Sequence, residues 1–273
     1  ECDGSQDFDM VLRLTEQAQK IVHIPKPLYF WRSHAQSVAS SVGAKPYVIQ
    51  AAKKAIGDHL KRVGLDGEAL DSVVPSMYRL KYEIKGEPLI SILIPNKDHV
   101  SDLRKCIVSI QEKTSYPNYE IIVIENNSEE EKTFQYYQLL EKRRNIRVVC
   151  WNGKFNYSAI NNFGYTFAKG EYILLLNNDT EVIEPDSLRR MLAICQRSEV
   201  GIVGAKLLYD DNTVQHAGIV IGYQGVAGHA FTGIGDDVYG YFARAVLTQE
   251  LSAVTAACLL TKRSVFEQVG KLD

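Results

Sequence analysis

The segment that most constrains the fold runs from Glu171 to Glu181 and reads EYILLLNNDTE. Its first part, Tyr172 to Leu176, is continuously apolar, which is typical of a strand buried on both faces of a parallel sheet. Its second part, from Asn177 onward, supplies amide and carboxylate oxygens directly after that strand. Open α/β folds bind ligands at the carboxyl edge of the sheet, and hard oxygen ligands suit Mg2+ or Mn2+. The segment therefore indicates a cation-dependent binding site, or alternatively an ordinary turn rich in Asn and Asp.

Strand and helix patterns alternate from residue 89 onward. The predicted strands are 89–94, 119–124, 146–150 and 172–176, with a later apolar strand at 252–260. The predicted helices are 101–113, begun by Ser101 as its cap, 129–142, 157–169, 185–197 and 264–269. This alternation predicts an α/β fold: a Rossmann-like, mostly parallel sheet with right-handed crossovers and helices on its flanks.

Two blocks precede the α/β region. Their predicted elements are a helix begun by Ser5, short strands at 20–24 and 28–32, a connector helix at 47–62, a loop at 65–76 and an edge strand at 77–84. The sequence thus predicts an N-terminal appendage of one helix and short strands over 1–34 and a connector over 35–88. The acids at the start of the first helix, Asp7 and Asp9, are by themselves explained by the favourable charge of a helix N-terminus.

Composition excludes several functional classes. The chain has 273 residues, 45% of them hydrophobic, and a net charge of -2 without a long basic run, which argues against a nucleic-acid partner. The five Cys residues form no CxxC pair and no even framework, as expected in a reducing compartment. Neither a membrane span nor a signal peptide is apparent. We therefore expect a cytoplasmic protein, or one at the inner face of the cell membrane.

Polar side chains follow three of the predicted strands. The three sites are Pro95-Asn-Lys-Asp98, Glu125-Asn-Asn-Ser128 and Asn177-Asn-Asp-Thr180. Acids and amides at successive carboxyl ends suit recognition of a base and ribose together with a metal-bridged diphosphate, although such residues are also ordinary in βα loops. No GxGxxG motif and no P-loop occurs, which argues against a dinucleotide oxidoreductase and a P-loop kinase.

These segments, in this order, resemble the family 2 glycosyltransferases of the GT-A fold, especially rhamnosyltransferase-like members. The resemblance rests on ISILIP at 90–95, YEIIVIENNS at 119–128, NNFG at 161–164, GEYILLLNND at 170–179 and VGIVGAK at 200–206. It implies transfer of a sugar from a nucleotide-diphosphate donor to a saccharide or lipid-linked saccharide acceptor. It also implies help from Mn2+ or Mg2+ and a role in building a cell-surface polysaccharide.

The resemblance also implies roles for single residues. Pro95, Asn96 and Asp98 match the loop that lines the nucleotide, Glu125 and Asn126 match the pair that reads the base, and Asn161 stands where many relatives carry an Arg near the diphosphate. Asn177, Asn178 and Asp179 match the DxD motif. Because Asn177 replaces the first Asp, Asp179 is the one charged metal ligand that remains. His216 and His229 match the acceptor side, with loop or core histidines as the alternative.

The first block resembles the C-terminal part of the same family. Asp7 matches the catalytic base, with Gln6 in place of the preceding acid, and Arg32-Ser-His34 matches a later motif. Residues 1–34 would then end an upstream transferase domain, and 89–273 would be a second domain truncated before its own base. We expect residues 1–34 to dock on that domain, within one chain or by exchange between two copies, so that Asp7 comes near Asp179.

The resemblance implies that the sugar is transferred with inversion at its anomeric carbon. Such a transfer needs one carboxylate that removes the proton of the acceptor hydroxyl, and a single base suffices. Two other functions stay open. A sugar-1-phosphate nucleotidyltransferase would need a basic Gly-rich loop after the first strand, and residues 95–98 are not one. A non-catalytic module that binds nucleotide-sugar or carbohydrate is compatible with Asn177 and with the absent downstream base.

Overall fold

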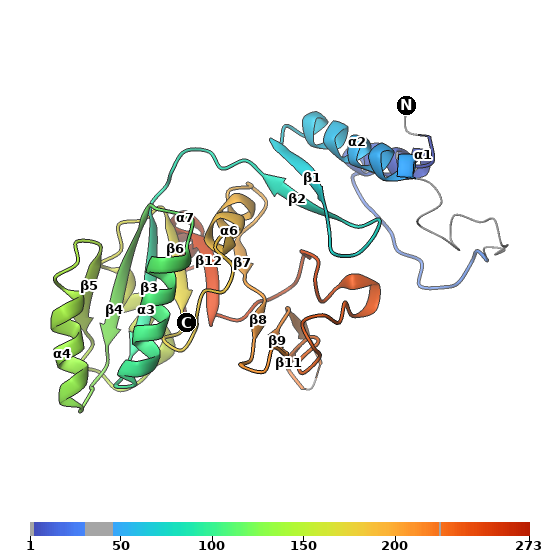
Figure 1. Cartoon of the computed structure of the whole chain (residues 1–273). Helices are drawn as coiled ribbons and strands as arrows, with labels where there is room; N and C mark the ends of the chain where they lie inside the picture. The colour runs from blue at the N-terminus through green and yellow to red at the C-terminus, as the bar shows by residue number, and fades with distance from the viewer. Residues whose placement is uncertain (1–2, 31–45, 224) are drawn as a thin grey trace. The chain divides into compact units, whose positions relative to one another are not determined.

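The computed structural model describes residues 3–30, 46–223 and 225–273. The chain forms two compact units, Glu1–Glu83 with Tyr241–Thr248, and Ile84–Gly240 with Gln249–Asp273, and each is described by itself. In the first unit the elements are α1 (Gln6–Gln17), α2 (Pro46–Arg62), β1 (Gly67–Asp71), β2 (Tyr78–Tyr82) and the 3-10 turn η3 (Tyr241–Ala243), labelled in part in Figure 1. Within the described residues, no helix is both long and apolar enough to span a bilayer.

The second unit is built on a six-stranded sheet. Its larger elements are β3 (Ile90–Asn96), α3 (Val100–Lys113), β4 (Tyr119–Glu125), α4 (Glu131–Leu140), β5 (Ile146–Cys150), α5 (Tyr157–Tyr165), β6 (Tyr172–Leu176), α6 (Ser187–Cys195), β7 (Ile202–Gly204), β12 (Cys258–Lys262) and α7 (Arg263–Gln268). The strand order is β5-β4-β3-β6-β12-β7. Strands β3 to β6 run parallel, while β12 is antiparallel to both β6 and β7. The predicted mostly parallel α/β sheet is thereby confirmed.

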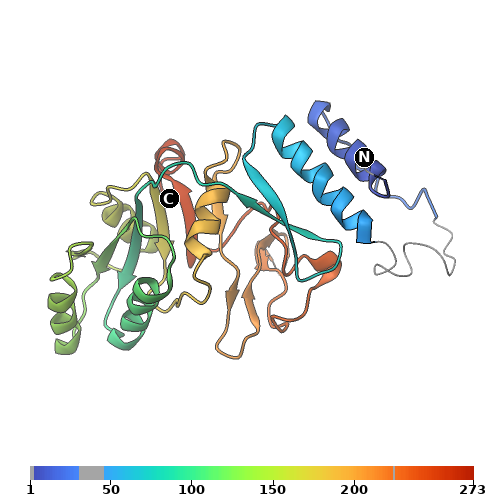
Figure 2. The same cartoon turned by 45° about the horizontal axis from the view of Figure 1, so that its top comes forward.

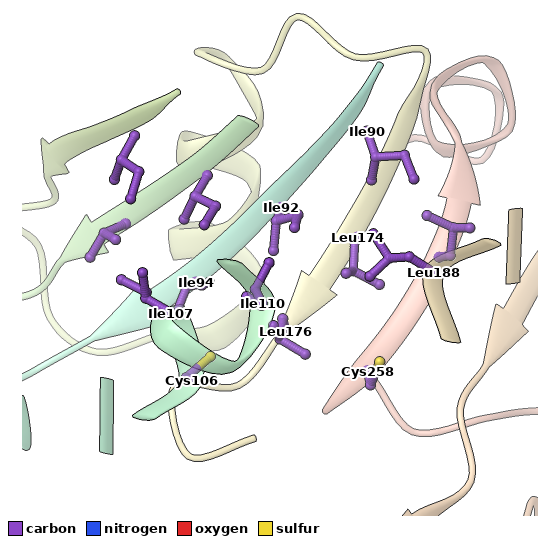
Figure 3. Packing of buried hydrophobic residues seen from close by; sticks show 14 of the residues in the cluster. Ile90, Ile92, Ile94, Cys106, Ile107, Ile110, Leu174, Leu176, Leu188 and Cys258 are labelled. Atoms are coloured by element: carbon purple, nitrogen blue, oxygen red, sulfur yellow. The ribbon is translucent and has the colours of Figure 1, made fainter. Parts of the chain in front are cut away.

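Side chains that alternate along the strands feed two hydrophobic cores, one on each face of the sheet. The cluster around Ile90, Ile92 and Ile94 includes buried residues of α3, α4 and α6, and Figure 3 shows its centre. The cluster around Leu93 and Ile124 includes residues of α5 and α7. Because successive strand residues point to opposite faces, helices cover both sides of the sheet, as Figure 2 also shows.

Strand β6 begins unusually close to β3. A Cβ atom at Gly170 would lie 2.6 Å from the carbonyl oxygen of Leu89 and 2.6 Å from the amide nitrogen of Ser91. Glycine is therefore required at this position if the apolar run from Tyr172 is to pair with β3 from its first residue.

Two small antiparallel pairs lie between β7 and β12 in sequence. They consist of β8 (Leu207–Leu208) with β9 (Val214–His216), and of β10 (Ile219–Ile221) with β11 (Ala227–His229). The backbone N–H of Ile219 donates to the carbonyl of Ala253 at 3.2 Å. This bond ties the β10–β11 hairpin to the segment that leads into β12.

In the first unit, polar contacts join α1 to α2. The hydroxyl of Ser5 donates to the carbonyl of Val48 at 3.1 Å. The carboxylate of Glu16 contacts His59 at 2.7 Å and accepts hydrogen bonds from the guanidinium of Arg62 at 2.8–3.0 Å. Hydrogen bonds from Arg62 first, and then from His59, lower the pKa of Glu16 to about 2.

Several predicted elements of the first unit are wrong. Ser5 precedes α1 but makes no capping bond, because its hydroxyl donates to α2 instead. Residues 20–24 and 28–30 form no strand, since none of the described strands pairs with them. The described short strands lie in the connector instead: β2 confirms the predicted edge strand at 77–84, and its partner β1 lies within the predicted loop at 65–76. Residues 31–34, and with them Arg32 and His34, lie outside the described residues.

Two boundaries in the second unit also differ from expectation. Helix α3 begins at Val100 after His99, which adopts a left-handed conformation with φ 46, so Ser101 lies inside the first turn rather than at the cap. The strand expected at 252–260 starts only at Cys258, since the residues before it bond to β9, β10 and the end of β6. The assignments of 1–34, 35–88 and 89–273 to separate domains stay predictions.

Candidate active site

The carboxyl ends of β3 and β4 meet, as expected for neighbouring parallel strands. Asn96 pairs with Glu125 in the register of the two strands, and the N–H of Asn126 donates to the carbonyl of Asn96 at 2.9 Å. The expected contact between the loops at 95–98 and 125–128 is confirmed, because the N–H of Asp98 also donates to the hydroxyl of Ser128 at 2.9 Å.

Both carboxylate oxygens of Glu125 are engaged inside the protein. Oε1 accepts the backbone N–H of Ser128 at 2.5 Å, and Oε2 accepts its hydroxyl at 2.5 Å. Oε2 also accepts the hydroxyl of Tyr137 at 2.7 Å, and the side chain is 5% exposed. These contacts hold the loop after β4 in shape, and the contact of Glu125 with a base stays a prediction.

Tyr137 is the residue that sequence reasoning missed. It projects from α4, donates to Glu125 and accepts a hydrogen bond from Nδ2 of Asn96 at 2.8 Å. Burial raises the pKa of Tyr137 above its usual range, so the phenol stays protonated and remains a donor. Its place on the buried face of α4 could have been predicted from helical spacing, but the polar contact could not.

One carboxylate oxygen of Asp98 is engaged at the start of α4, and its role beside a nucleotide stays a prediction. Its Oδ1 accepts the N–H groups of Glu129 and Glu130, both at 3.0 Å, and the hydroxyl of Thr133 at 3.3 Å, at the start of α4. Desolvation acts to raise the pKa of Asp98, but these hydrogen bonds outweigh it and the pKa lies below its usual value. The carboxylate therefore ties the segment that leads into α4, and the hydroxyl of Thr133 in its first turn, to the loop after β3.

Asn126 has one side of its amide free. Its Nδ2 donates both to the carbonyl of Trp151 at 3.2 Å and to that of Gly153 at 3.1 Å. These two bonds fix the amide orientation, so the oxygen is presented as an acceptor. Within the described residues Oδ1 of Asn126 accepts no hydrogen bond, although the residue is only 4% exposed, and its contact with a base stays a prediction.

The residues at the end of β6 are open by comparison. Asp179 is exposed, and within the described parts of the chain no hydrogen bond or ion pair holds its carboxylate. Asn177 is half-buried; its backbone N–H donates to the carbonyl of Ala257 at 3.0 Å, whereas its side chain makes no such contact. Asn178 donates from Nδ2 to Oδ1 of Asn96 at 2.6 Å, which links this loop to the end of β3.

Asn161 is buried in the middle of α5, and its place near the diphosphate stays a prediction. The side chain is fully buried on α5, and its Nδ2 donates to the carbonyl of Tyr157 one turn earlier at 2.9 Å. Its Oδ1 is buried and has no hydrogen-bond partner. The hydroxyl of Tyr157 donates to the carbonyl of Ala256 at 3.1 Å, so α5 is anchored to the segment that also holds Asn177.

The two predicted acceptor-side histidines contact each other. The rings of His216 and His229 lie 4.8 Å apart, centroid to centroid, in an edge-to-face arrangement. Nε2 of His216 accepts the backbone N–H of Thr255 at 3.4 Å, and Nδ1 of His229 lies 3.1 Å from the carbonyl of Gln215. Burial, and secondly His229, lower the pKa of His216 to about 4, so that the ring is neutral near pH 7.

Asp7, the predicted base, belongs to the first unit. It is exposed in the first turn of α1, where its Oδ1 accepts the N–H of Phe8 at 2.8 Å. The predicted approach of Asp7 to Asp179 joins two units that are described separately, so it stays a prediction.

The open oxygens at the end of β6 fit a divalent cation only in part. Among the described residues no group of three or more His, Cys, Asp or Glu side chains could hold a metal ion. Mg2+ and Mn2+ are commonly bound by one or two carboxylates that share the ion with substrate phosphates and waters. The free carboxylate of Asp179 beside Asn177 suits that arrangement, in which the donor supplies the remaining ligands.

Comparisons with known proteins agree with this geometry. The uncharacterized protein y4gI of Sinorhizobium fredii is 45% identical over 277 residues, which is 99% of this chain and 30% of that protein. The O-antigen biosynthesis protein RfbC of Myxococcus xanthus is 39% identical over 274 residues, which is 99% of this chain and 21% of that protein. The chain thus spans less than a third of either of these curated relatives.

A solved structure shares the fold. The mannosyltransferase PcManGT of Pyrobaculum calidifontis, in complex with GDP-Man and Mn2+, superposes with a TM-score of 0.50 and 13% identity, over 68% of this chain and 48% of that one. This likeness shows the GT-A arrangement of the sheet. Residues 91–270 match the sequence model of the family "Glycosyl transferase family 2". With the sheet order, the polar carboxyl edge and this match in agreement, the chain belongs to the family 2 glycosyltransferases.

Proposed function

We propose that the protein transfers a sugar from a nucleotide-diphosphate donor to a saccharide hydroxyl with inversion, assisted by Mn2+ or Mg2+, during the synthesis of a cell-surface polysaccharide. The kinship with an O-antigen biosynthesis protein supports the polysaccharide context. The structural neighbour that contains GDP-Man and Mn2+ supports the donor class and the metal.

One observation supports the proposal most. Within the described residues, the carboxylate of Asp179 has no hydrogen bond or ion pair, and it lies shortly after a fully buried strand. By contrast, both oxygens of Glu125 and Oδ1 of Asp98 accept internal hydrogen bonds. A free carboxylate at the carboxyl edge of an α/β sheet is suited to a cation-bridged diphosphate. In the bound state the cation would offset the charge that develops on the leaving diphosphate.

The residues around Asp179 would divide the remaining work. The free amide oxygen of Asn126 would accept a hydrogen bond from the base, while Pro95, Asn96 and Asp98 would shape the wall behind it. Asn177 and Asn178 would position the diphosphate. Proton removal from the acceptor hydroxyl would fall to Asp7, provided that residues 1–34 dock beside the sheet edge in one chain or between two copies.

Calorimetry with UDP, dTDP and GDP, each with and without Mn2+, tests the donor site. We expect one of the three nucleotides to bind in a Mn2+-dependent way, and Asp179→Ala to weaken that binding about tenfold or more. Asp210→Ala, which removes another exposed carboxylate of the same unit, serves as the matched control and should leave the affinity unchanged. Equal metal-dependent affinity in Asp179→Ala and the parent protein would contradict the proposal.

Turnover assays with a nucleotide-sugar and an acceptor separate the alternatives. A non-catalytic binding module would bind the nucleotide-sugar yet release no nucleoside diphosphate when supplied with acceptor. A nucleotidyltransferase would consume a nucleoside triphosphate and a sugar 1-phosphate. The second is disfavoured because the loop after β3 is held by the polar contacts of Asn96 and Asp98 and is neither basic nor Gly-rich.

A further inference from the structure

The hairpin formed by β10 and β11 lacks charge. No Asp, Glu, Lys or Arg occurs between Asp211 and Asp236, although such residues make up 23% of the chain. A surface hairpin is normally kept soluble by charged side chains along its edges. The absence of charge here is therefore a feature that the donor site does not explain.

Apolar side chains on this hairpin are exposed on both of its faces. Ile221 is 64% exposed and Val226 is 90% exposed, and Val220 and Tyr223 are also open to solvent. Adjacent residues of a strand point to opposite sides, so exposure of both Val220 and Ile221 means that the hairpin projects from the unit. Tyrosine beside aliphatic residues is typical of a surface with one wet and one apolar side.

Two backbone hydrogen bonds join described residues near the hairpin end. The N–H of Gly222 donates to the carbonyl of Val226 at 2.9 Å, and the N–H of Tyr223 donates to the carbonyl of Val220 at 3.4 Å. These two bonds lower the cost of placing the hairpin end in the polar interface of a bilayer, the depth that a two-stranded sheet with open edges can occupy.

The root of the hairpin is joined to the end of β6. Ile219 bonds to Ala253, and His216, which precedes the hairpin, accepts the N–H of Thr255. Two residues later in the same segment, the carbonyl of Ala257 accepts the N–H of Asn177. One short segment, residues 253–257, therefore links the root of the hairpin to the end of β6.

We propose that the β10–β11 hairpin inserts its exposed apolar side chains into the interface of a lipid bilayer and so holds the donor edge against a membrane that carries the acceptor. The inference rests on the proposed function, because a lipid-linked saccharide would present its hydroxyl at that depth. A protein partner is a poorer match, since a stable protein interface needs on the order of 20 residues a side and the hairpin end offers few. With a net charge of -2, the attachment is apolar rather than electrostatic.

Vesicle sedimentation tests the proposal without donor or acceptor. The parent protein should sediment with phosphatidylcholine vesicles to the same extent at low and high salt, because apolar insertion is not screened. The double variant Ile221→Glu with Val226→Glu should lower the partition coefficient about tenfold or more. Leu139→Glu, at a 53% exposed apolar residue on α4, is the matched control and should sediment like the parent protein.

A second variant guards against misfolding of the double variant. Val226→Trp adds an indole at a 90% exposed position, and its fluorescence should shift to shorter wavelength when vesicles are added, beyond any shift of the two native Trp residues. No sedimentation of the parent protein, equal sedimentation of the double variant, or binding that requires anionic lipid and disappears in salt would each overturn the proposal. So would a hairpin variant that changes only the oligomeric state.

The membrane proposal and the transferase proposal can be refuted independently of each other. A protein that binds nucleotide with Mn2+ but ignores vesicles would refute the membrane hairpin and leave the transferase proposal standing. A protein that binds vesicles through the hairpin but no nucleotide would do the reverse.

Discussion

The ends of β3 and β4 and the end of β6 belong to one sheet edge, yet they use their polar atoms differently. We call the first part, made of Asn96, Asp98 and Glu125, the closed half, because hydrogen bonds inside the protein engage these side chains. The second part, Asn177 and Asp179, is the open half, since no internal hydrogen bond holds its side chains within the described residues. Acids at a strand end can thus serve the loop or serve a ligand, and only their partners tell which.

Removing Glu125 should have the largest effect on stability. Glu125→Ala deletes the acceptor of three donors, two from Ser128 and one from Tyr137, in a site where the side chain is 5% exposed. Buried donors left without partners are costly, so we expect a loss of about 2–4 kcal/mol in the free energy of unfolding, measured with urea. Glu129→Ala on the same loop, where the residue is exposed, is the control and should change it by less than about 0.5 kcal/mol.

If Glu125 instead served mainly the ligand, the variant would lose nucleotide affinity without losing stability. That outcome would abolish the distinction between the two halves.

The sequence predicts the strands and the polar edge of the sheet, but it does not predict which of the polar side chains are engaged by internal hydrogen bonds. The apolar runs at 90–94, 119–124 and 172–176 fixed the strands, and their order placed three polar loops on one edge. The engagement of Glu125 depends on Tyr137, which lies on a helix and reaches the site only through packing. The hydrogen bonds that Oδ1 of Asp98 accepts from Glu129 and Glu130 likewise join residues that are 31 and 32 positions apart, so the sequence did not indicate them.

In the appendage, residues 1–34, the sequence predicts strands that the structure does not form over residues 3–30, the part that it describes. Residues 20–24 have the composition of a strand, yet a strand exists only where a partner supplies hydrogen bonds, and none is present among the described residues. The Gly-rich stretch after Val200 was likewise too irregular for its short strands to be assigned from periodicity.

Acid should destabilise the segment that bonds to the end of β6, because His216 contacts that segment. His216 holds Thr255, and its pKa falls from 6.5 to about 4 on folding, so the unfolded chain takes up a proton before the folded one does. The neutral ring of His216 therefore contributes fully to the free energy of unfolding above pH 6.5. That contribution, up to about 3 kcal/mol, is lost progressively as the pH falls from 6.5 to about 4.

Urea unfolding of the parent protein and of His216→Gln, followed over this pH range, isolates the effect. The free energy of unfolding of the parent should fall more steeply than that of the variant, while His23→Gln, at an exposed histidine, should follow the parent. Parallel curves for the parent and His216→Gln would show that the buried ring does not titrate in this range.

Asn177→Asp should have the smallest effect on stability of the variants considered, and it should raise the affinity for Mn2+. Asn177→Asp places a second carboxylate beside Asp179 in the open half, where the residue is half-buried and its side chain has no internal hydrogen bond to lose. We expect the free energy of unfolding to change by less than about 0.5 kcal/mol, because a turn at a strand end accepts Asp as readily as Asn. Two neighbouring carboxylates repel each other when no cation is present, and a divalent cation relieves that repulsion. Mn2+ affinity in the presence of the nucleoside diphosphate should therefore rise about tenfold, which calorimetry would detect.

The same exchange in the closed half, Asn96→Asp, should have the opposite effects. It replaces the amide that donates to Tyr137 and Asp98 in a buried site, so the free energy of unfolding should fall and the affinity for Mn2+ should not rise. If Asn96→Asp raised Mn2+ affinity as much as Asn177→Asp, the metal would lie between the two halves and the open half alone would not define its site.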